Sequence, residues 1–340
     1  MKKIAGIIAM VLMVAMLMAA CGGSSSSAPA ATSGSGFKGT IKVSHGLPDT
    51  HPVQDALLAM AADVEAKTNG DIKFEIHPNA ELGSEKDNIE QLQIGALGMA
   101  KVSASALEAF APVYEAFSVP YIFNDEEHYF KVMDGEIAEE VFMSTKDKGF
   151  VALTWLDSGA RSFYTKDTPI NTPADLKGLM IRTMDSPMAF QMMDAFGGSA
   201  TTIPISDVFT AIQTGTIDGA ENNPTAMTLG HGEVAKCYSF DEHTRIPDII
   251  LISTTIWDQM SAEQQQILKE ACDKVKEDYK AIWAANVADA IERAQSEYGV
   301  VFNYPDKTPF QEAVKPIYDK LAADEPDVWA VCAKIQEAGK

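Results

Sequence analysis

Two arginines stand where expected strands end in loops, Arg161 in "GARSFYT" and Arg182 in "KGLMIRTMDSP". A guanidinium group stays charged, and its burial costs several kcal/mol unless it is paired. Because α/β proteins place ligands where strand ends meet at one edge of a sheet, we expect the two side chains to converge there. Two guanidinium groups could hold one carboxylate in the bidentate geometry that lysine does not supply. The residues alone leave open whether the partner is an internal carboxylate or a ligand.

Two further features add groups suited to an anion or to hydroxyls. The loop "DGAENNP" offers the amides of Asn222 and Asn223. Ser186 and Pro187 predict a helix start, with serine as the N-cap and proline at the first helical position. Such a helix start has free N–H groups and a dipole that favours negative charge. Together these residues are consistent with a binding site for a small anion in the central part of the chain, and an internal ion pair stays the alternative.

No comparable set of residues points to catalysis, a metal or a cofactor. The 6 histidines lie outside any H-E-x-x-H pattern, and no G-x-S-x-G motif occurs. The letters "GSGFKG" match G-x-G-x-x-G, but they precede the first predicted strand instead of linking a strand to a helix. No spacing of the carboxylates singles out an acid–base pair. We therefore expect a binding protein and no enzyme, without a metal or cofactor.

The elements that position these residues follow an alternating pattern. "TIKVSHGL" and "DIKFEIHP" read as strands around a helix that stops at Asn69-Gly70, and a second helix begins near Ser84. This order favours a parallel α/β sheet. A later helix begins at a capping box of Ser261 and Gln264, and its apolar stripe continues to about Tyr298. A helix of about 35 residues would be about 50 Å long, so we expect it to cross two lobes.

Length, charge and cysteine content limit the class of protein. The part expected to fold runs from about Phe37 to Lys340, roughly 300 residues, a length that usually splits into two lobes. The formal net charge of −21 makes nucleic acid and anionic membranes poor partners. A small anion remains compatible, because exposed charges are screened beyond about 8 Å. Cys237, Cys272 and Cys332 form neither a disulfide framework nor a metal knuckle, and we expect buried thiols.

The first residues predict export. Lys2 and Lys3 precede the apolar run "IAGIIAMVLMVAMLM", so residues 1–20 read as a signal peptide. "MAAC" places Cys21 at a cleavage site like that of bacterial lipoproteins, and residues 21–36 form a Gly/Ser/Ala/Pro tether suited to an anchored protein. We expect a lipid on Cys21 and a location on the outer face of the cytoplasmic membrane. The alternative is an ordinary secretory signal with an incidental cysteine and a soluble periplasmic protein.

Almost the whole of the exported chain resembles the solute-binding proteins of TRAP (tripartite ATP-independent periplasmic) transporters, of the dicarboxylate and sugar-acid type. The resemblance rests on ordered stretches that include "IKVSHGLPDTHPVQDALLAMAADVEAKTNGDIKFEIHPNAELGSEKDNIEQLQIGAL", "GARSFYT", "DLKGLMIRTMDSP", "VFTAIQTGTIDGAENN" and "DEHTRIPDIILIST". It implies an α/β fold like that of periplasmic binding proteins, with two lobes, hinge strands and one long helix spanning both. We expect lobe I at 37–158 plus 248–287, and lobe II at 159–247 plus 288–340.

The resemblance also implies roles for single residues. In this family the arginine of K-G-L-x-I-R, here Arg182, forms a bidentate salt bridge with the ligand carboxylate. Arg161 corresponds to the arginine of G-x-R-x-F, and Asn222 to the asparagine after D-G-x-E. Glu85 in "LGSEK" matches a position that often contacts ligand hydroxyls, with a helix-end charge as the alternative. His45 lies in a loop that lines the cleft in many members, with a packing role as the alternative.

The resemblance implies a cargo and partners. Ser103 stands where sialic-acid binders carry a glutamate, which argues against sialic acid. The motifs are most similar to those of members that take C6 sugar acids such as glucuronate or galacturonate, and a C4-dicarboxylate or another organic acid is the alternative. The expected protein is a monomer that delivers its cargo to TRAP membrane permease subunits. A binder for an ABC-type importer, a secreted hydrolase and a sensor domain of the same fold are the rival classes.

Overall fold

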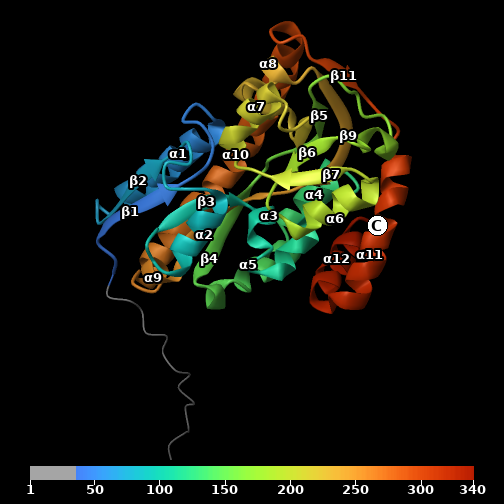
Figure 1. The fold of residues 1–340 in the computed structure, drawn as a ribbon. Helices are drawn as coiled ribbons and strands as arrows, with labels where there is room; N and C mark the ends of the chain where they lie inside the picture. Colours follow the sequence, from blue (N-terminus) through green and yellow to red (C-terminus); the bar gives the residue numbers. More distant parts are fainter. Residues whose placement is uncertain (1–35) are drawn as a thin grey trace, which may run out of the picture. The chain divides into compact units, whose positions relative to one another are not determined.

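Two β-sheets organise residues 36–340, the part of the chain that the computed structural model describes (Figure 1). The first sheet has the strand order β2-β1-β3-β10-β4. Its strands are β1 (Gly39–Ser44), β2 (Ile72–His77), β3 (Met99–Ser103), β4 (Phe150–Leu156) and β10 (Asp248–Ser253). β1 pairs in parallel with β2 and β3, as predicted for an alternating α/β pattern, whereas β10 runs antiparallel to β3 and β4. The signal peptide, Cys21 and nearly all of the tether lie outside the described residues.

The second sheet carries the arginines. Its order is β11-β9-β5-β8-β6-β7. The strands are β5 (Ala160–Thr165), β6 (Met180–Thr183), β7 (Ser199–Thr202), β8 (Gly219–Asn222), β9 (Cys237–Arg245) and β11 (Val301–Asn303). β5 runs antiparallel to β8, with Ser162 opposite Asn222, and β8 runs parallel to β6. The start of β5 therefore lies at the same edge as the ends of β6 and β8, which brings Arg161, Arg182 and Asn222 to one edge.

The predicted starts of α2 and α6 and the predicted ends of α1 and α6 are confirmed. Helix α1 (Pro52–Lys67) ends just before Asn69-Gly70, and α2 (Glu85–Gln93) begins at a capping box of Ser84 and Asp87. Helix α6 (Pro187–Phe196) has Ser186 as its N-cap and ends at Gly197 in the left-handed conformation that glycine adopts easily.

The other short helices are α3 (Ala104–Leu107), η1 (Pro112–Phe117), α4 (Glu126–Met133), α5 (Glu136–Met143), η2 (Lys146–Lys148), η3 (Pro173–Leu176), α7 (Ile205–Thr214), η4 (Pro224–Leu229), α8 (His231–Val234) and α9 (Thr254–Trp257).

Helix α10 (Ala262–Ser296) is the long helix expected from the apolar stripe. It has 35 residues and begins at a capping box of Ser261 and Gln264. It packs against α1 and β4, which belong with the first sheet, and against η4, which follows β8 of the second sheet. One helix thus supports both lobes of the fold, and it crosses between them in Figure 1. Among residues 36–340, no helix combines the length and apolar character needed to cross a membrane.

The strands of each sheet fall within one of the two expected lobes, but some helices and one apolar core contact both lobes. Every strand of the first sheet falls within 37–158 or 248–287, and every strand of the second within 159–247 or 288–340. However, α12 (Pro326–Ala338) packs against η1 and α4, while α11 (Thr308–Asp324) packs against α6. One apolar core joins Val102 of β3 to Phe163 of β5. The boundaries therefore stay a prediction for the helical parts.

Candidate functional site

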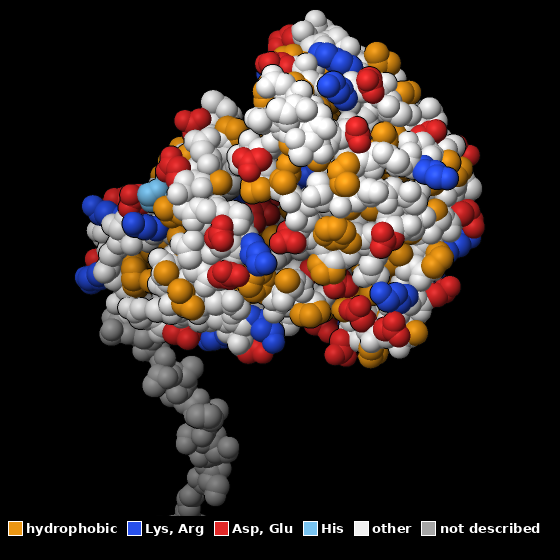
Figure 2. Space-filling view, in the orientation of Figure 1, with side chains coloured by type: hydrophobic (Ala, Val, Ile, Leu, Met, Phe, Trp, Pro, Cys, Tyr) orange, Lys and Arg blue, Asp and Glu red, His pale blue; other side chains and the backbone are white. Residues whose placement is uncertain are grey.

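A cavity of about 280 Å³ lies between the two sheets and is lined from both lobes. Its second-lobe wall includes Arg161, Arg182 and Asn222, and its first-lobe wall includes Glu85 and Lys101. The space-filling view shows this face hollowed between the lobes, with acidic side chains visible inside the hollow (Figure 2). The volume lies just below the usual range for ligand pockets, about 300–1,000 Å³, and therefore suits a small molecule.

Arg182 is a buried cation without an internal counter-ion. Its side chain extends from β6 into the cavity wall, the residue is 6% exposed, and its Nε donates to the carbonyl of Ile203 at 2.8 Å. None of the ion pairs formed within residues 36–340 includes Arg182. Burial lowers the pKa of Arg182, while nearby Glu221 opposes that shift. Because arginine does not lose its proton in proteins, the terminal N–H groups present an uncompensated positive charge that an anion can neutralise.

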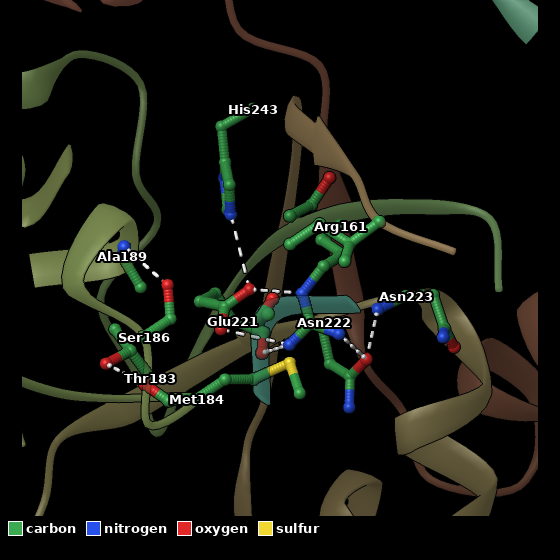
Figure 3. Close-up of polar contacts among 12 residues, drawn as sticks. Arg161, Thr183, Met184, Ser186, Ala189, Glu221, Asn222, Asn223 and His243 are labelled. Carbon is green, nitrogen blue, oxygen red and sulfur yellow. Dashed lines mark hydrogen bonds and ion pairs between the residues drawn. The ribbon is translucent and has the colours of Figure 1, made fainter. Parts of the chain in front are cut away.

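Arg161 is equally buried, but its charge is satisfied inside the protein. Its Nε donates to Glu221 Oε2 at 2.6 Å and its Nη2 to Glu221 Oε1 at 2.9 Å, a bidentate pair. Nη1 donates to Asn222 Oδ1 at 2.8 Å. Figure 3 shows Glu221 and Asn222 against the Arg161 guanidinium. Of the two partners left open for Arg161, the structure shows an internal carboxylate, that of Glu221, while Arg161 also lines the cavity and its contact with a ligand stays a prediction.

The carboxylate of Glu221 also contacts His243, which pairs in turn with Asp241. His243 Nε2 lies 3.4 Å from Glu221 Oε2, and His243 Nδ1 lies 2.7 Å from Asp241 Oδ2 (Figure 3). Burial alone would raise the pKa of Glu221, but Arg161 and His243 outweigh it and lower that pKa to about 2. Burial would lower the pKa of His243, but Asp241 and Glu221 raise it to about 9. Two cations and two anions thus cancel, and the Arg161 network (Arg161, Glu221, His243, Asp241) adds no net charge to the cavity.

Asn222 is oriented by this network. Its Oδ1 accepts from Arg161 Nη1 and from the backbone N–H of Asn223 at 2.9 Å, so its amide NH₂ is left to serve as a donor at the cavity wall. The side chain of Asn223 caps η4 instead, since its Oδ1 accepts from the backbone N–H of Thr225 at 3.0 Å. Of the two amides in "ENN", the structure therefore assigns a free donor to Asn222.

The first-lobe wall holds a cluster that the sequence did not reveal. Glu85 Oε1 accepts from the backbone N–H of Ser103 at 3.1 Å and from Lys101 Nζ at 3.4 Å. Lys101, 3% exposed, also lies 3.0 Å from Asp248 Oδ1. Burial would lower the pKa of Lys101, but Asp248 and Glu85 outweigh it and raise that pKa, so the lysine is charged. A lysine inside the apolar stretch "GMAKVSAS" was the signal that could have located this cluster.

Two expected groups lie away from the cavity lining. His45 is fully buried, its Nε2 is 2.8 Å from Gln54 Oε1, and burial lowers its pKa. Nearby His51 lines the cavity instead, and burial lowers its pKa to about 3, so it is neutral. The start of α6 is also occupied, because Glu108 Oε2 accepts from Ser186 Oγ at 2.7 Å and from the Met188 N–H at 3.2 Å. The start of this helix is therefore occupied by a carboxyl group of the protein, that of Glu108.

In the part of the chain that the structure describes, no group of three or more His, Cys, Asp or Glu side chains is arranged to hold a metal ion. The polar groups that line the cavity include the Arg182 guanidinium, the Asn222 amide and the mixed-charge cluster of Glu85, Lys101 and Asp248. This arrangement can bind a small molecule that has an anionic end and polar groups elsewhere.

Comparison with known proteins gives a consistent result. A profile of the bacterial extracellular solute-binding proteins, family 7, matches residues 43–325. The Salmonella typhimurium protein YiiZ is 42% identical over 292 residues, 85% of this chain and 89% of that one. A TRAP periplasmic solute-binding protein from Anaerococcus prevotii, solved with bound α/β-D-glucuronate, is 40% identical with a TM-score of 0.86, covering 88% of this chain and 98% of that one. A Sulfitobacter protein of the same kind, solved with β-D-galacturonate, is 33% identical with a TM-score of 0.85, covering 88% of this chain and all of the other.

Proposed function

Since this chain belongs to the bacterial extracellular solute-binding proteins of family 7, the solute-binding components of TRAP transporters, we propose that its cargo is a hexuronate such as glucuronate or galacturonate. The unpaired guanidinium of Arg182 at the cavity wall carries this proposal, because it requires a monoanionic partner from outside the fold. The two solved relatives with bound uronates support the choice of ligand class.

The geometry suggests how each group would contribute. The ligand carboxylate pairs with the Arg182 guanidinium, and the Asn222 amide donates to the same end of the ligand. On the opposite wall, Glu85 and Lys101 accept from and donate to the ring hydroxyls. Because Arg182 belongs to one lobe and Glu85 to the other, a ligand that contacts both favours a closed arrangement of the lobes, which is domain closure by differential affinity. His45 acts through packing on Gln54 rather than by contact with the cargo.

The cellular setting follows from the leader and the family. The protein would be exported, carry a lipid on Cys21 at the outer face of the cytoplasmic membrane, and pass its cargo as a monomer to TRAP permease subunits. Intact-mass spectrometry of the protein purified from membranes tests the anchor: a mass increase by a diacylglyceryl group on Cys21 supports it, and an unmodified cysteine contradicts it.

Calorimetry with D-glucuronate and D-galacturonate tests the function. The wild-type protein should bind at least one of them, and Arg182→Ala should lose about 2–5 kcal/mol of binding free energy, as is typical when one partner of a buried charge pair is removed. Arg182→Lys should also lose much of the affinity, because the bidentate geometry is lost. Arg293→Ala is the control, since that arginine lies on the exposed side of α10 and pairs with Glu297. Unchanged affinity in Arg182→Ala would refute the assignment.

A further inference from the structure

Two sets of charged groups that line the cavity, one on each wall, have opposite net charge. On the second-lobe wall, Arg182 contributes one unpaired positive charge, and the Arg161 network contributes none because its four charges cancel. On the first-lobe wall, the Lys101 ammonium meets two carboxylates, those of Glu85 at 3.4 Å and Asp248 at 3.0 Å. One carboxylate is in excess in this cluster. Lys86 and Asp185 also line the cavity, are 57% and 62% exposed, and offset each other at 4.0 Å. The neutral His51 does not change this balance.

The first-lobe cluster is built into the fold and faces the ligand space. Lys101 comes from β3 and Asp248 from the adjacent antiparallel strand β10, so the sheet fixes the pair. The side chains of Lys101 and Asp248 are 4% and 10% exposed, and both residues line the cavity together with Glu85. The indole Nε1 of Trp283, also at the cavity wall, is buried without a hydrogen-bond partner among the described residues. The carboxylates of Glu85 and Asp248 therefore offer acceptors on this wall to a ligand.

Hydroxyl groups and a carboxylate interact with such a wall in opposite ways. A hydroxyl can donate to Glu85 or Asp248 and at the same time accept from the third N–H of Lys101. A carboxylate can only accept, and a like charge about 4 Å from Glu85 or Asp248 is repelled, because the surroundings of buried groups screen charges less than water does. The single ammonium is already shared between two carboxylates and leaves little attraction for a third.

We propose that the Lys101–Glu85–Asp248 cluster is a selectivity element that accepts the hydroxyl-bearing end of a monocarboxylate and rejects a second carboxylate. This inference rests on the proposed function and refines it, because it places the anionic end at Arg182 and excludes dianions. It distinguishes a hexuronate from a C4-dicarboxylate, because only the dicarboxylate has a negative charge at the end that lies away from Arg182. The selecting groups are Glu85 and Asp248, and Lys101 positions both.

Three ligands that differ only at one carbon test the proposal. D-glucuronate carries an aldehyde or hemiacetal at C1, L-gulonate an alcohol at the same carbon, and D-glucarate a second carboxylate there. The last two are both open chains and form the matched pair. Titration calorimetry at pH 7.5 with the wild-type protein should show L-gulonate bound more tightly than D-glucarate by about 10- to 100-fold, since the second carboxylate meets the acidic wall.

Neutral isosteres then connect the discrimination to the cluster. Glu85→Gln and Asp248→Asn each remove one negative charge with little change in shape, and each should reduce the gulonate-to-glucarate ratio by roughly tenfold. Asp185→Asn is the control, because the Asp185 side chain is 62% exposed at the cavity mouth, 4.0 Å from Lys86, and its loss should leave the ratio unchanged.

The outcomes separate the inference from the function on which it depends. Binding of D-glucuronate with equal affinity for L-gulonate and D-glucarate overturns the inference and leaves the proposed function standing. A ratio that does not change in both Glu85→Gln and Asp248→Asn also overturns it, because the discrimination then lies elsewhere. If no uronate and no gulonate binds, the proposed function fails and the inference fails with it.

Discussion

Arg161 and Arg182 lie in the same sheet and are 5% and 6% exposed, yet their surroundings differ. Arg161 has a bidentate carboxylate partner in Glu221, and a histidine–aspartate pair stands behind that carboxylate. Arg182 has one hydrogen bond to a carbonyl oxygen and no ion pair within residues 36–340. The difference shows that burial alone does not identify a ligand-binding arginine. Whether the protein supplies the counter-charge decides the role, and each prediction below probes that contrast.

The largest effect is expected when Glu221 is lost. Glu221→Ala leaves two cations, Arg161 and His243, buried together with only Asp241 as an anion. Breaking a buried pair by removing one partner costs about 3–5 kcal/mol of unfolding free energy. Urea denaturation of the ligand-free variant checks this. Glu126→Ala is the control, since its pair with Arg245 is exposed at Glu126 and should cost less than about 1 kcal/mol. A loss equal to that of the control would show that Arg161 needs no internal partner.

A double variant should recover most of that loss. Arg161→Met combined with Glu221→Met replaces the pair by apolar side chains, and such replacements of buried pairs are often neutral or stabilising. His243 keeps Asp241 as its partner at 2.7 Å. The same urea experiment should give an unfolding free energy within about 1–2 kcal/mol of the wild type. If the double variant is as unstable as Glu221→Ala, the Arg161 network supports the fold in a further way.

Removal of the Arg182 charge should raise the unfolding free energy of the ligand-free protein, whereas the loss of Glu221 lowers it. Arg182→Met eliminates a desolvated cation without a partner, so the ligand-free protein should become more stable by about 1–3 kcal/mol while uronate binding is lost. Thermal unfolding without and with D-glucuronate measures both, because a ligand bound by the folded state alone raises its apparent stability. A clear destabilisation of the ligand-free Arg182→Met variant would mean that Arg182 has a structural partner after all.

A dependence of the unfolding free energy on pH is expected from two buried groups, His243 of the Arg161 network and Glu108. The pKa of His243 is about 9 in the folded protein and 6.5 in its unfolded reference. The folded state therefore holds an extra proton between these values, and stability is lost as pH rises through about 9, by up to about 1.4 kcal/mol per pH unit. Burial raises the pKa of Glu108 to about 8 with the same sign, so Glu108→Gln should remove the lower part of the loss and keep the part above pH 8. Uronate affinity at Arg182 should stay constant from pH 6.5 to 8.

The sequence predicted the elements well, whereas the carboxylate-binding role of Arg182 stays a prediction. Capping boxes and glycine stops depend on a few neighbouring residues, so the starts of α2, α6 and α10 followed from local chemistry. The length of α10 was also correct, because one apolar stripe continues along 35 residues. The assignment of Arg182 needed the resemblance to a family, since its partner could equally have been internal.

The pairings across strands could not be read from the sequence. Glu221 precedes Asn222 in the same strand, and only the antiparallel register of β5 and β8 brings its carboxylate to Arg161. Lys101 and Asp248 are far apart in the chain and meet because β10 returns beside β3. The start of α6 was expected to be free for a ligand, and the tertiary approach of Glu108 fills it instead. Charge partners set by tertiary contacts decide the site, and residue types alone do not.

A crystal structure of the protein with D-glucuronate tests the central claim most directly. The account predicts the ligand carboxylate in bidentate contact with the Arg182 guanidinium, at about 2.7–2.9 Å, with the Arg161–Glu221 pair intact and the opposite end of the sugar on the Lys101 cluster. A carboxylate bound at the Lys101 cluster, or one that displaces Glu221 from Arg161 while Arg182 stays unpaired, would contradict it.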